Sequence, residues 1–312
     1  MADIRTIAGK LSCGQGDTPN TGRLGCLSLF STPDHLLGVK KGFKIPANTV
    51  FDLAYLTPLI QDGTIVPLID SSTFEDVSAE DAYSTNSSGV KRLNLKGLPE
   101  YKFVYEEGHE LYRQLDRFTS FKELDFIIGD ISGNWMMVVN SDGSYGGFTA
   151  GHTTAELRKN QIQGGDAESR SLMIQFLDRA QFDRNYTILH QDQLDFVPSD
   201  VPSINGAHIE YVTIPSAGAG VVVDITVHLN SDHNTIVTGL LTGDLLVTVN
   251  GVTNANASFT ETPNGTYAIT LTDAISAGET ITVSTFDGAV NSNVSDVSGV
   301  LFRGEVSAEV LA

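Results

Sequence analysis

The sequence predicts a mainly β protein of two domains, an α+β domain with one covering helix followed by a β-sandwich. The chain has 312 residues, about twice the ~150 residues of a typical domain. Residues 198–206 are rich in proline, serine and aspartate, which is typical of a linker. Beyond it, Arg303 stands alone against eleven acidic residues. We therefore place the first domain at 1–197, the linker at 198–206 and the second domain at 207–312.

The N-terminal domain begins with two predicted strands. Leu24–Phe30 and Leu36–Phe43 are apolar runs on either side of a turn at Pro33. Residues 70–89 follow, and they are rich in serine, aspartate and glutamate. This stretch is too polar to bury, so we expect a loop that is flexible or becomes ordered only on assembly.

The rest of this domain reads as a sheet with one helix. A strand at Pro99–Tyr105 precedes a helix at about His109–Phe118, whose apolar stripe is formed by Leu111, Leu115 and Phe118. Four further apolar or alternating segments predict strands: Leu124–Asp130, Trp135–Val139, Tyr145–Phe148 and Ser171–Leu177. This order of elements predicts an α+β sheet covered by one helix.

The C-terminal domain reads as strand after strand. Asn250-Gly251 and Asn264-Gly265 are strong tight-turn signals, because both residue types tolerate positive φ. Seven segments alternate β-branched or aromatic residues with polar ones: Ile209–Ile214, Gly220–Leu229, Leu245–Val249, Ser258–Thr262, Thr266–Leu271, Thr280–Ser284 and Val300–Arg303. Seven strands in about 100 residues predict an immunoglobulin-like β-sandwich. The stretch Asp244–Val283 resembles bacterial and phage immunoglobulin-like repeats, which bears on fold and hardly on function.

The charge balance is strongly acidic. Asp and Glu total 38 against 19 Lys and Arg, for a formal net charge of −19. This balance opposes tight binding to nucleic acid, which needs cationic grooves. No apolar run approaches the ~18 residues that cross a bilayer, and residues 1–6 lack the pattern of a secretion signal. We therefore expect no membrane insertion.

No motif in the sequence predicts catalysis. Neither a nucleophile elbow nor a phosphate-binding loop is present. Asp125 and Asp130 flank an apolar strand, which favours solvated strand ends over a glycosidase pair. Tyr101, Phe103 and Tyr105 could stack on bases or sugars, but packing beneath the helix is the more ordinary interpretation. We predict that the protein is not an enzyme and has no catalytic or cofactor-binding residues.

Residues that could bind a metal are scattered along the sequence. His228 with Asp232 and His233 is the nearest approach to a metal cluster, and its position at a strand end favours an exposed polar turn. Asp287 and Asp296 leave a weak calcium interpretation, but the Asp-x-Asp-x-Asp-Gly pattern is missing. We therefore predict no metal site.

Several segments together carry a resemblance to a known class of proteins. The opening Cys13-Gly14-Gln15-Gly16…Cys26 resembles the start of virion proteins from phages of Bacteroidota. The middle resembles the same group at Tyr101–Gly108, Leu111-Tyr112, Leu124–Phe126, Asp130, Gly133-Asn134, Asp142-Gly143 and Gly147-Phe148. The layout of sheet, helix and polar loop resembles the major tail tube protein of long-tailed phages. Some tube proteins carry an added C-terminal immunoglobulin-like domain.

The glycine-rich loop between Cys13 and Cys26 departs from the general tube pattern, which does not require it. A disulfide closing this loop would contribute about 3 kcal/mol in the chain-entropy model. The alternative is two reduced, partly buried thiols. The sequence leaves both open.

The resemblance implies a structural virion subunit that forms stacked hexameric rings around a DNA-conducting channel, assembled in the host cytoplasm. Its partners would be further copies of itself and other virion proteins, with DNA only as non-specific cargo. Asp125, Asp130, Asp142 and Asp166 are candidates for a negative channel wall. The alternative is a head-associated or capsid decoration protein, whose outward immunoglobulin-like domain adheres weakly to host or glycans.

Overall fold

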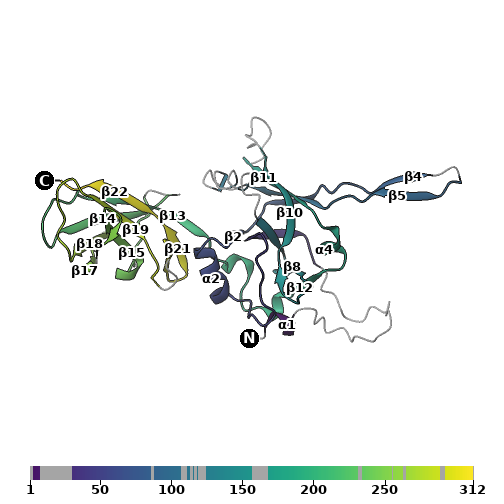
Figure 1. Ribbon diagram of the computed structural model, residues 1–312, viewed down its shortest axis with the longest axis horizontal. Coiled ribbons are helices and arrows are strands. Elements are labelled where there is room, and N and C mark those ends of the chain that lie inside the picture. The colour runs from purple at the N-terminus through teal and green to yellow at the C-terminus, as the bar shows by residue number, and fades with distance from the viewer. Residues whose placement is uncertain are drawn as a thin grey trace. The chain divides into compact units, whose positions relative to one another are not determined.

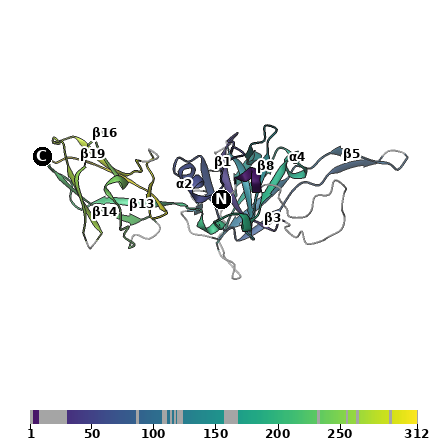
Figure 2. The same ribbon diagram turned by 90° about the horizontal axis from the view of Figure 1, so that it is seen from below.

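The computed structural model describes residues 3–7, 30–85, 88–106, 111–112, 115, 118, 124–156, 168–230, 234–254, 256–262, 265–288 and 292–311. It confirms a mainly β fold with several sheets (Figures 1 and 2). Two compact units emerge, Met1–Leu56 with Thr64–Val201, and Thr57–Gly63 with Pro202–Ala312. The division at Val201 falls within residues 198–206, whereas the grouping of Thr57–Gly63 with the second unit was not anticipated.

The N-terminal unit is built on one branched sheet. Its strands follow the order β12-β8-β7-β10-β11-β6-β3, with β1 joining β2 to β7 and β9 attached to β8. The strands are β1 (Pro33–Lys40), β2 (Ile65–Leu68), β3 (Thr73–Asp76), β6 (Glu100–Tyr105), β7 (Leu124–Asp130), β8 (Trp135–Val139), β9 (Tyr145–Gly146), β10 (Phe148–Ala155), β11 (Arg170–Phe176) and β12 (Tyr186–Leu189). A separate hairpin is formed by β4 (Ala82–Thr85) and β5 (Lys91–Leu95).

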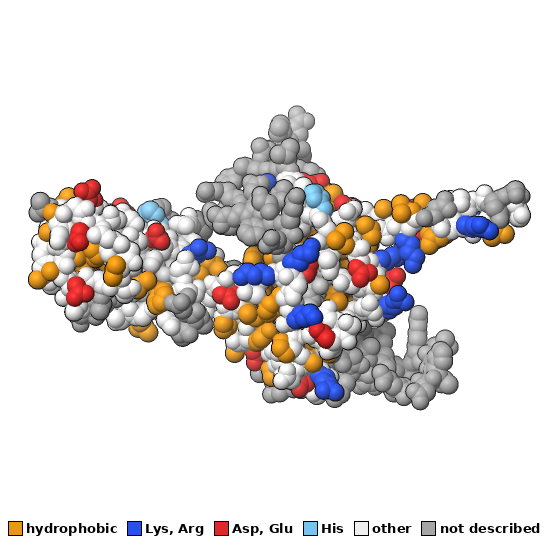
Figure 3. Space-filling view, in the orientation of Figure 1, with side chains coloured by type: hydrophobic (Ala, Val, Ile, Leu, Met, Phe, Trp, Pro, Cys, Tyr) orange, Lys and Arg blue, Asp and Glu red, His pale blue; other side chains and the backbone are white. Residues whose placement is uncertain are grey.

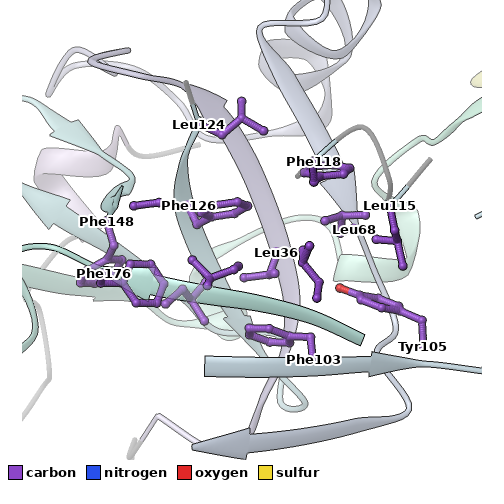
Figure 4. Close-up of a cluster of buried hydrophobic side chains, with 14 of the residues drawn as sticks. Leu36, Leu68, Phe103, Tyr105, Leu115, Phe118, Leu124, Phe126, Phe148 and Phe176 are labelled. Carbon is purple, nitrogen blue, oxygen red and sulfur yellow. The ribbon is translucent and has the colours of Figure 1, made fainter. Parts of the chain in front are cut away.

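One hydrophobic core lies inside this curved sheet (Figure 4). Leu36, Phe126 and Phe148 come from the neighbouring strands β1, β7 and β10, and Phe176 and Phe103 come from β11 and β6, which follow β10 in the sheet. The described residues 111, 112, 115 and 118 are helical, and Tyr112, Leu115 and Phe118 are buried in the same core. The described residues of the predicted helix therefore pack against the sheet as expected, with Leu111 at the margin of the core.

The central strand β7 is buried on both faces. Leu124, Phe126 and Ile128 belong to the core, and the residues between them are equally buried. On the second face Gly129 pairs with His35 of β1 and with Trp135 of β8. A Cβ on Gly129 would lie 2.9 Å from the Trp135 ring and 3.0 Å from the His35 Cβ. Glycine at this position therefore gives the indole the space to lie across the sheet.

The other described helices were not predicted from the sequence. They are α1 (Ile4–Ile7), α2 (Leu53–Gln61) and α4 (Arg179–Asp183), with 3₁₀ turns at Gln191–Gln193, Pro198–Asp200 and Thr242–Asp244. The turn expected at Pro33 is wrong, because Pro33 is the first residue of β1. The strand expected at Leu24–Phe30 lies, except for Phe30, outside the described residues.

The C-terminal unit is a sandwich of two sheets. The first has the order β17-β18-β14-β13-β21-β20, and the second β16-β15-β19-β22. Their facing side chains share one core, in which Val223, Ile225 and Tyr267 of the first sheet meet Val247 and Ile281 of the second. The strands are β13 (Ile204–Tyr211), β14 (Val222–Leu229), β15 (Leu245–Val249), β16 (Val252–Thr253), β17 (Asn256–Glu261), β18 (Thr266–Leu271), β19 (Thr280–Thr285), β20 (Ser295–Val297), β21 (Val300–Arg303) and β22 (Glu305–Glu309).

The predicted tight turn between β15 and β16 is confirmed. Asn250 has φ +49° and Gly251 has φ +80°, the left-handed pair that a two-residue hairpin requires. β13 begins at Ile204, so the predicted linker 198–206 is shorter in the structure than the sequence indicated. Three short strands that the sequence did not reveal, β16, β20 and β22, complete the sheets.

Candidate functional site: an exposed β-ribbon arm

Residues 73–105 form one long antiparallel ribbon with a break in the middle. Its root is the β3–β6 pair, in register from Thr73↔Val104 to Asp76↔Tyr101. After the break, β4 and β5 resume in the same register at Ala82↔Leu95, and a one-residue shift follows between Ala82 and Tyr83. We call the outer part, residues 82–96, the arm. The arm projects away from the sheets of the N-terminal unit (Figures 1 and 2).

The loop that was expected at residues 70–89 is wrong, because part of this stretch belongs to the ribbon. Most of the described residues of this stretch are exposed, as the composition indicated, but Thr73–Asp76 and Ala82–Thr85 are strands. A loop and an exposed strand have similar composition when neither face of the strand is buried. The partner strands, β6 and β5, both lie outside the stretch itself.

Large apolar side chains of the arm are exposed. Tyr83 and Leu93 lie directly opposite each other, so they share one face of the ribbon. Tyr83 is 58% exposed, Leu93 43%, Val90 56% and Leu95 69%. Two isolated strands are at best marginally stable in water, because they have no core of their own. The arm therefore carries the kind of surface that a partner covers.

The arm is also basic. Residues 82–96 contain Lys91, Arg92 and Lys96 and no acidic residue, in a chain whose acids outnumber its Lys and Arg by 38 to 19. Basic and apolar side chains lie along the projecting hairpin (Figure 3). Among the described residues no ion pair joins any of the three cations. The arm therefore differs in charge from the chain that carries it.

The break in the ribbon is held by a clamp. The Asp81 carboxylate accepts from the Gly97 N–H at 2.9 Å and pairs with the Arg179 guanidinium of α4. The Gly97 N–H, and then Arg179, hold the pKa of Asp81 below its usual value. A Cβ on Gly97 would lie 1.7 Å from the Ala79 carbonyl oxygen, so only glycine fits this close approach of two backbones. These contacts fix the direction of the arm.

The four predicted channel-wall acids do not form one exposed surface. Asp125 and Asp130 are buried, which contradicts their interpretation as solvated strand ends. Asp130 accepts hydrogen bonds from the backbone N–H groups of Ser31, Ser132 and Asn134, so its role is to hold a turn. Burial raises the pKa of Asp125.

The other two acids do not restore such a wall. Asp142 is exposed and bonds Lys44 at 2.5 Å, which lowers its pKa, while Asp166 lies outside the described residues. The sequence signal that could have identified Asp125 and Asp130 as buried is their position at the ends of a strand that is apolar on both faces.

The aromatic residues of β6 are not available for ligand stacking. Phe103 and Tyr105 are fully buried in the core, and Tyr101 packs edge-on against Phe74, Phe176 and Phe182 at 5.1–5.6 Å between ring centres. The interpretation as a packed sheet face is confirmed. Phe182 belongs to α4, so this aromatic cluster also connects α4, and with it Arg179, to the root of the ribbon.

One cluster of possible metal ligands was not singled out in the sequence: Asp34, His35 and Asp70. Its hydrogen bonds argue against a metal. The backbone N–H of Asp70 donates to His35 Nδ1 at 3.1 Å, so that nitrogen is the unprotonated one, and the N–H on Nε2 faces Asp34 at 3.7 Å. A metal ligand needs the reverse, a free lone pair on one nitrogen and a partner that accepts from the other. Burial lowers the pKa of His35, which favours the neutral ring.

The remaining candidates do not come together as sites. His228 lies opposite His208 across β13 and β14, while Asp232 and His233 lie outside the described residues. Burial, and then the charges of Asp287 and Asp296, raise the pKa of Asp244, so both carboxylates lie near Asp244. An acidic neighbourhood of this kind is not by itself a calcium site. Cys13 and Cys26 also lie outside the described residues.

No protein-family model matches the chain, and no curated protein matches it. No described helix has the length and apolarity needed to cross a membrane. A functional proposal must therefore rest on the geometry and charge of the chain itself. The arm is the feature whose chemistry the fold of a single copy does not explain.

Proposed function

We propose that the protein is a structural subunit of a tailed-phage virion, the major tail tube protein, which polymerises into stacked hexameric rings around a DNA-conducting channel. The observation that carries the proposal is the arm, an ordered ribbon that exposes Tyr83, Leu93 and Leu95 to solvent. A repeating assembly gives each arm a neighbouring subunit to cover it. The resemblance of the sequence to virion proteins supports the same conclusion.

The fold is suited to such a role. The curved sheet of the N-terminal unit has a complete core, so it can keep its shape while the arm makes contacts elsewhere. Closing sheets of neighbouring subunits into one barrel would also remove their exposed strand edges. In this role DNA is a passing cargo, and other virion proteins are further partners.

The alternative, a head-associated protein that adheres to glycans through its outer domain, gains no support from the side chains. Sugar-binding surfaces commonly present an aromatic ring for stacking. In the described part of the C-terminal unit, the exposed large hydrophobic side chains are aliphatic, as at Val212, Leu241 and Val252. The tube proposal is therefore the better supported one.

Negative-stain microscopy of the purified full chain at high concentration tests the proposal. We expect rings or tubes, and monomers alone would contradict it. A variant in which Ala82–Lys96 is replaced by an Asn-Gly turn should fold, because Asp81, Gly97 and Arg179 remain, but should no longer form tubes. Circular dichroism and thermal melting verify its folding, and normal polymerisation of the folded variant would remove the arm from the proposal.

A further inference from the structure

The outer edge of β22 has no partner strand among the described strands. Backbone bonds from Val310 to Glu279 and from Thr285 to Gly304 show that the even-numbered residues of this strand face β19. In an antiparallel ladder the alternate residues face the other way, so the N–H and C=O groups of Glu305, Ser307 and Glu309 point outward. They make no backbone hydrogen bond to a described residue. Just beyond β22 the same edge is bonded at Leu311 to Pro215 and Ala217, so only the stretch Glu305–Glu309 is open to another strand.

The side chains along this edge are acidic and exposed. Glu305, Ser307 and Glu309 alternate with half-buried residues, and neither glutamate makes an ion pair within the described residues. Charged residues on an edge normally prevent it from pairing with its own kind. Two β22 edges would bring glutamates together, which is unfavourable. A basic strand is the partner that such an edge accepts.

The arm has the complementary chemistry. Among the described strands, each of its two strands pairs only with the other, so the second edge of each has no described partner strand. Lys91, Arg92 and Lys96 supply positive charge without a single acid in residues 82–96. Other cations of the N-terminal unit are paired with acids, as in Lys44–Asp142 and Lys102–Glu75.

We propose that the arm of one copy adds edge-on to β22 of a second copy, so that the cations on one face of the arm lie beside Glu305 and Glu309. This inference rests on the proposed self-assembly and specifies the two surfaces that meet in it. Backbone hydrogen bonds supply the affinity of such strand addition, and the charges set its specificity. Because arm and edge are different surfaces, the contact is head-to-tail and propagates from copy to copy until a ring closes.

Charge reversal tests the pairing of the two surfaces in the full chain. Lys91→Glu with Arg92→Glu, or Glu305→Lys with Glu309→Lys, should each weaken self-association in sedimentation velocity by about tenfold or more, because attraction becomes repulsion. The combination of all four should restore it. Matched controls, Lys41→Glu with Arg184→Glu and Glu210→Lys with Asp273→Lys, change the same charge at other exposed sites and should have little effect.

A proline tests the backbone contact separately from charge. Ser307→Pro removes an N–H that faces outward, so the ladder with β19 stays intact. Ser307→Ala is its control, since both variants lose the hydroxyl that contacts Thr282 at 2.8 Å. We expect unchanged folding in both, with association weakened only in the proline variant. Equal association of the two would overturn strand addition.

The outcomes separate this inference from the proposed function. A wild-type chain that stays monomeric contradicts the proposed function. A chain that assembles normally in both charge-reversed variants keeps the proposed function and overturns the inference. Salt-sensitive binding of double-stranded DNA by the wild type, lost in Lys91→Glu with Arg92→Glu, would assign the arm to nucleic acid and would also overturn it.

Discussion

The root and the tip of the ribbon 73–105 are both antiparallel strand pairs, but they have opposite environments. At the root, Phe74, Tyr101 and Phe103 pack into an aromatic cluster. At the tip, Tyr83 and Leu93 pair in the same antiparallel manner and are exposed. Backbone pairing is therefore common to both halves, and burial distinguishes them. Side chains at the root stabilise the fold, and side chains at the tip are free to serve assembly.

The largest expected difference in the free energy of unfolding is between Phe103→Ala and Leu93→Ala. Phe103 is fully buried, so its truncation should destabilise the N-terminal unit by about 3–5 kcal/mol through lost burial and a cavity. Leu93 is exposed, and its truncation should change stability by less than about 0.5 kcal/mol. Denaturant unfolding measures both. A comparable loss in Leu93→Ala would show that the tip packs against its own chain.

An intermediate effect is expected at the break between the halves. In Gly97→Ala the new Cβ meets the Ala79 carbonyl oxygen, and the backbone must shift at a cost of about 1–3 kcal/mol. Gly243→Ala is the control, because a Cβ there meets nothing within 4 Å. Thermal melting compares the two, and microscopy of Gly97→Ala should show impaired polymerisation. If Gly97→Ala had the stability of the wild type and still formed tubes, the proposed role of the clamp would be contradicted.

The smallest expected effect is the loss of the clamp's contacts when the Asp81 carboxylate is protonated. Because the pKa of Asp81 is lowered in the folded chain, its contribution is present above the usual Asp value and is lost as pH falls through the lowered one. The Gly97 amide signal in an NMR titration reports this directly, and its midpoint should lie below about 3.9. Arg179→Gln should move the midpoint upward. A wild-type midpoint at or above the ordinary Asp value would show that the clamp is open in solution.

Sequence reasoning succeeded where one local pattern determines the element. Leu124–Asp130, Trp135–Val139 and Thr266–Leu271 were predicted with the bounds that the structure has, because each is a run of apolar or alternating residues ended by a turn. The helix was found from its apolar stripe. The Asn250-Gly251 turn was found from the backbone angles that its residues tolerate.

The arm and the β22 edge could not be predicted in the same way. β4 has no buried face, so its residues lack the alternation that identifies a half-buried strand. Pairing of Thr73 with Val104 depends on a contact across thirty-one positions, which no local window contains. The close approach that requires Gly97 becomes visible only once both strands are placed.

Trp135 makes the two units distinguishable by optical spectroscopy. It is the only tryptophan in the chain, it is fully buried, and its indole N–H has no hydrogen-bond partner among the described residues. Its fluorescence should therefore be emitted at short wavelength and shift to the red when water reaches the ring. That signal reports only the N-terminal unit, while circular dichroism reports both. A urea titration followed by both probes should give two curves that separate wherever the sandwich unfolds independently.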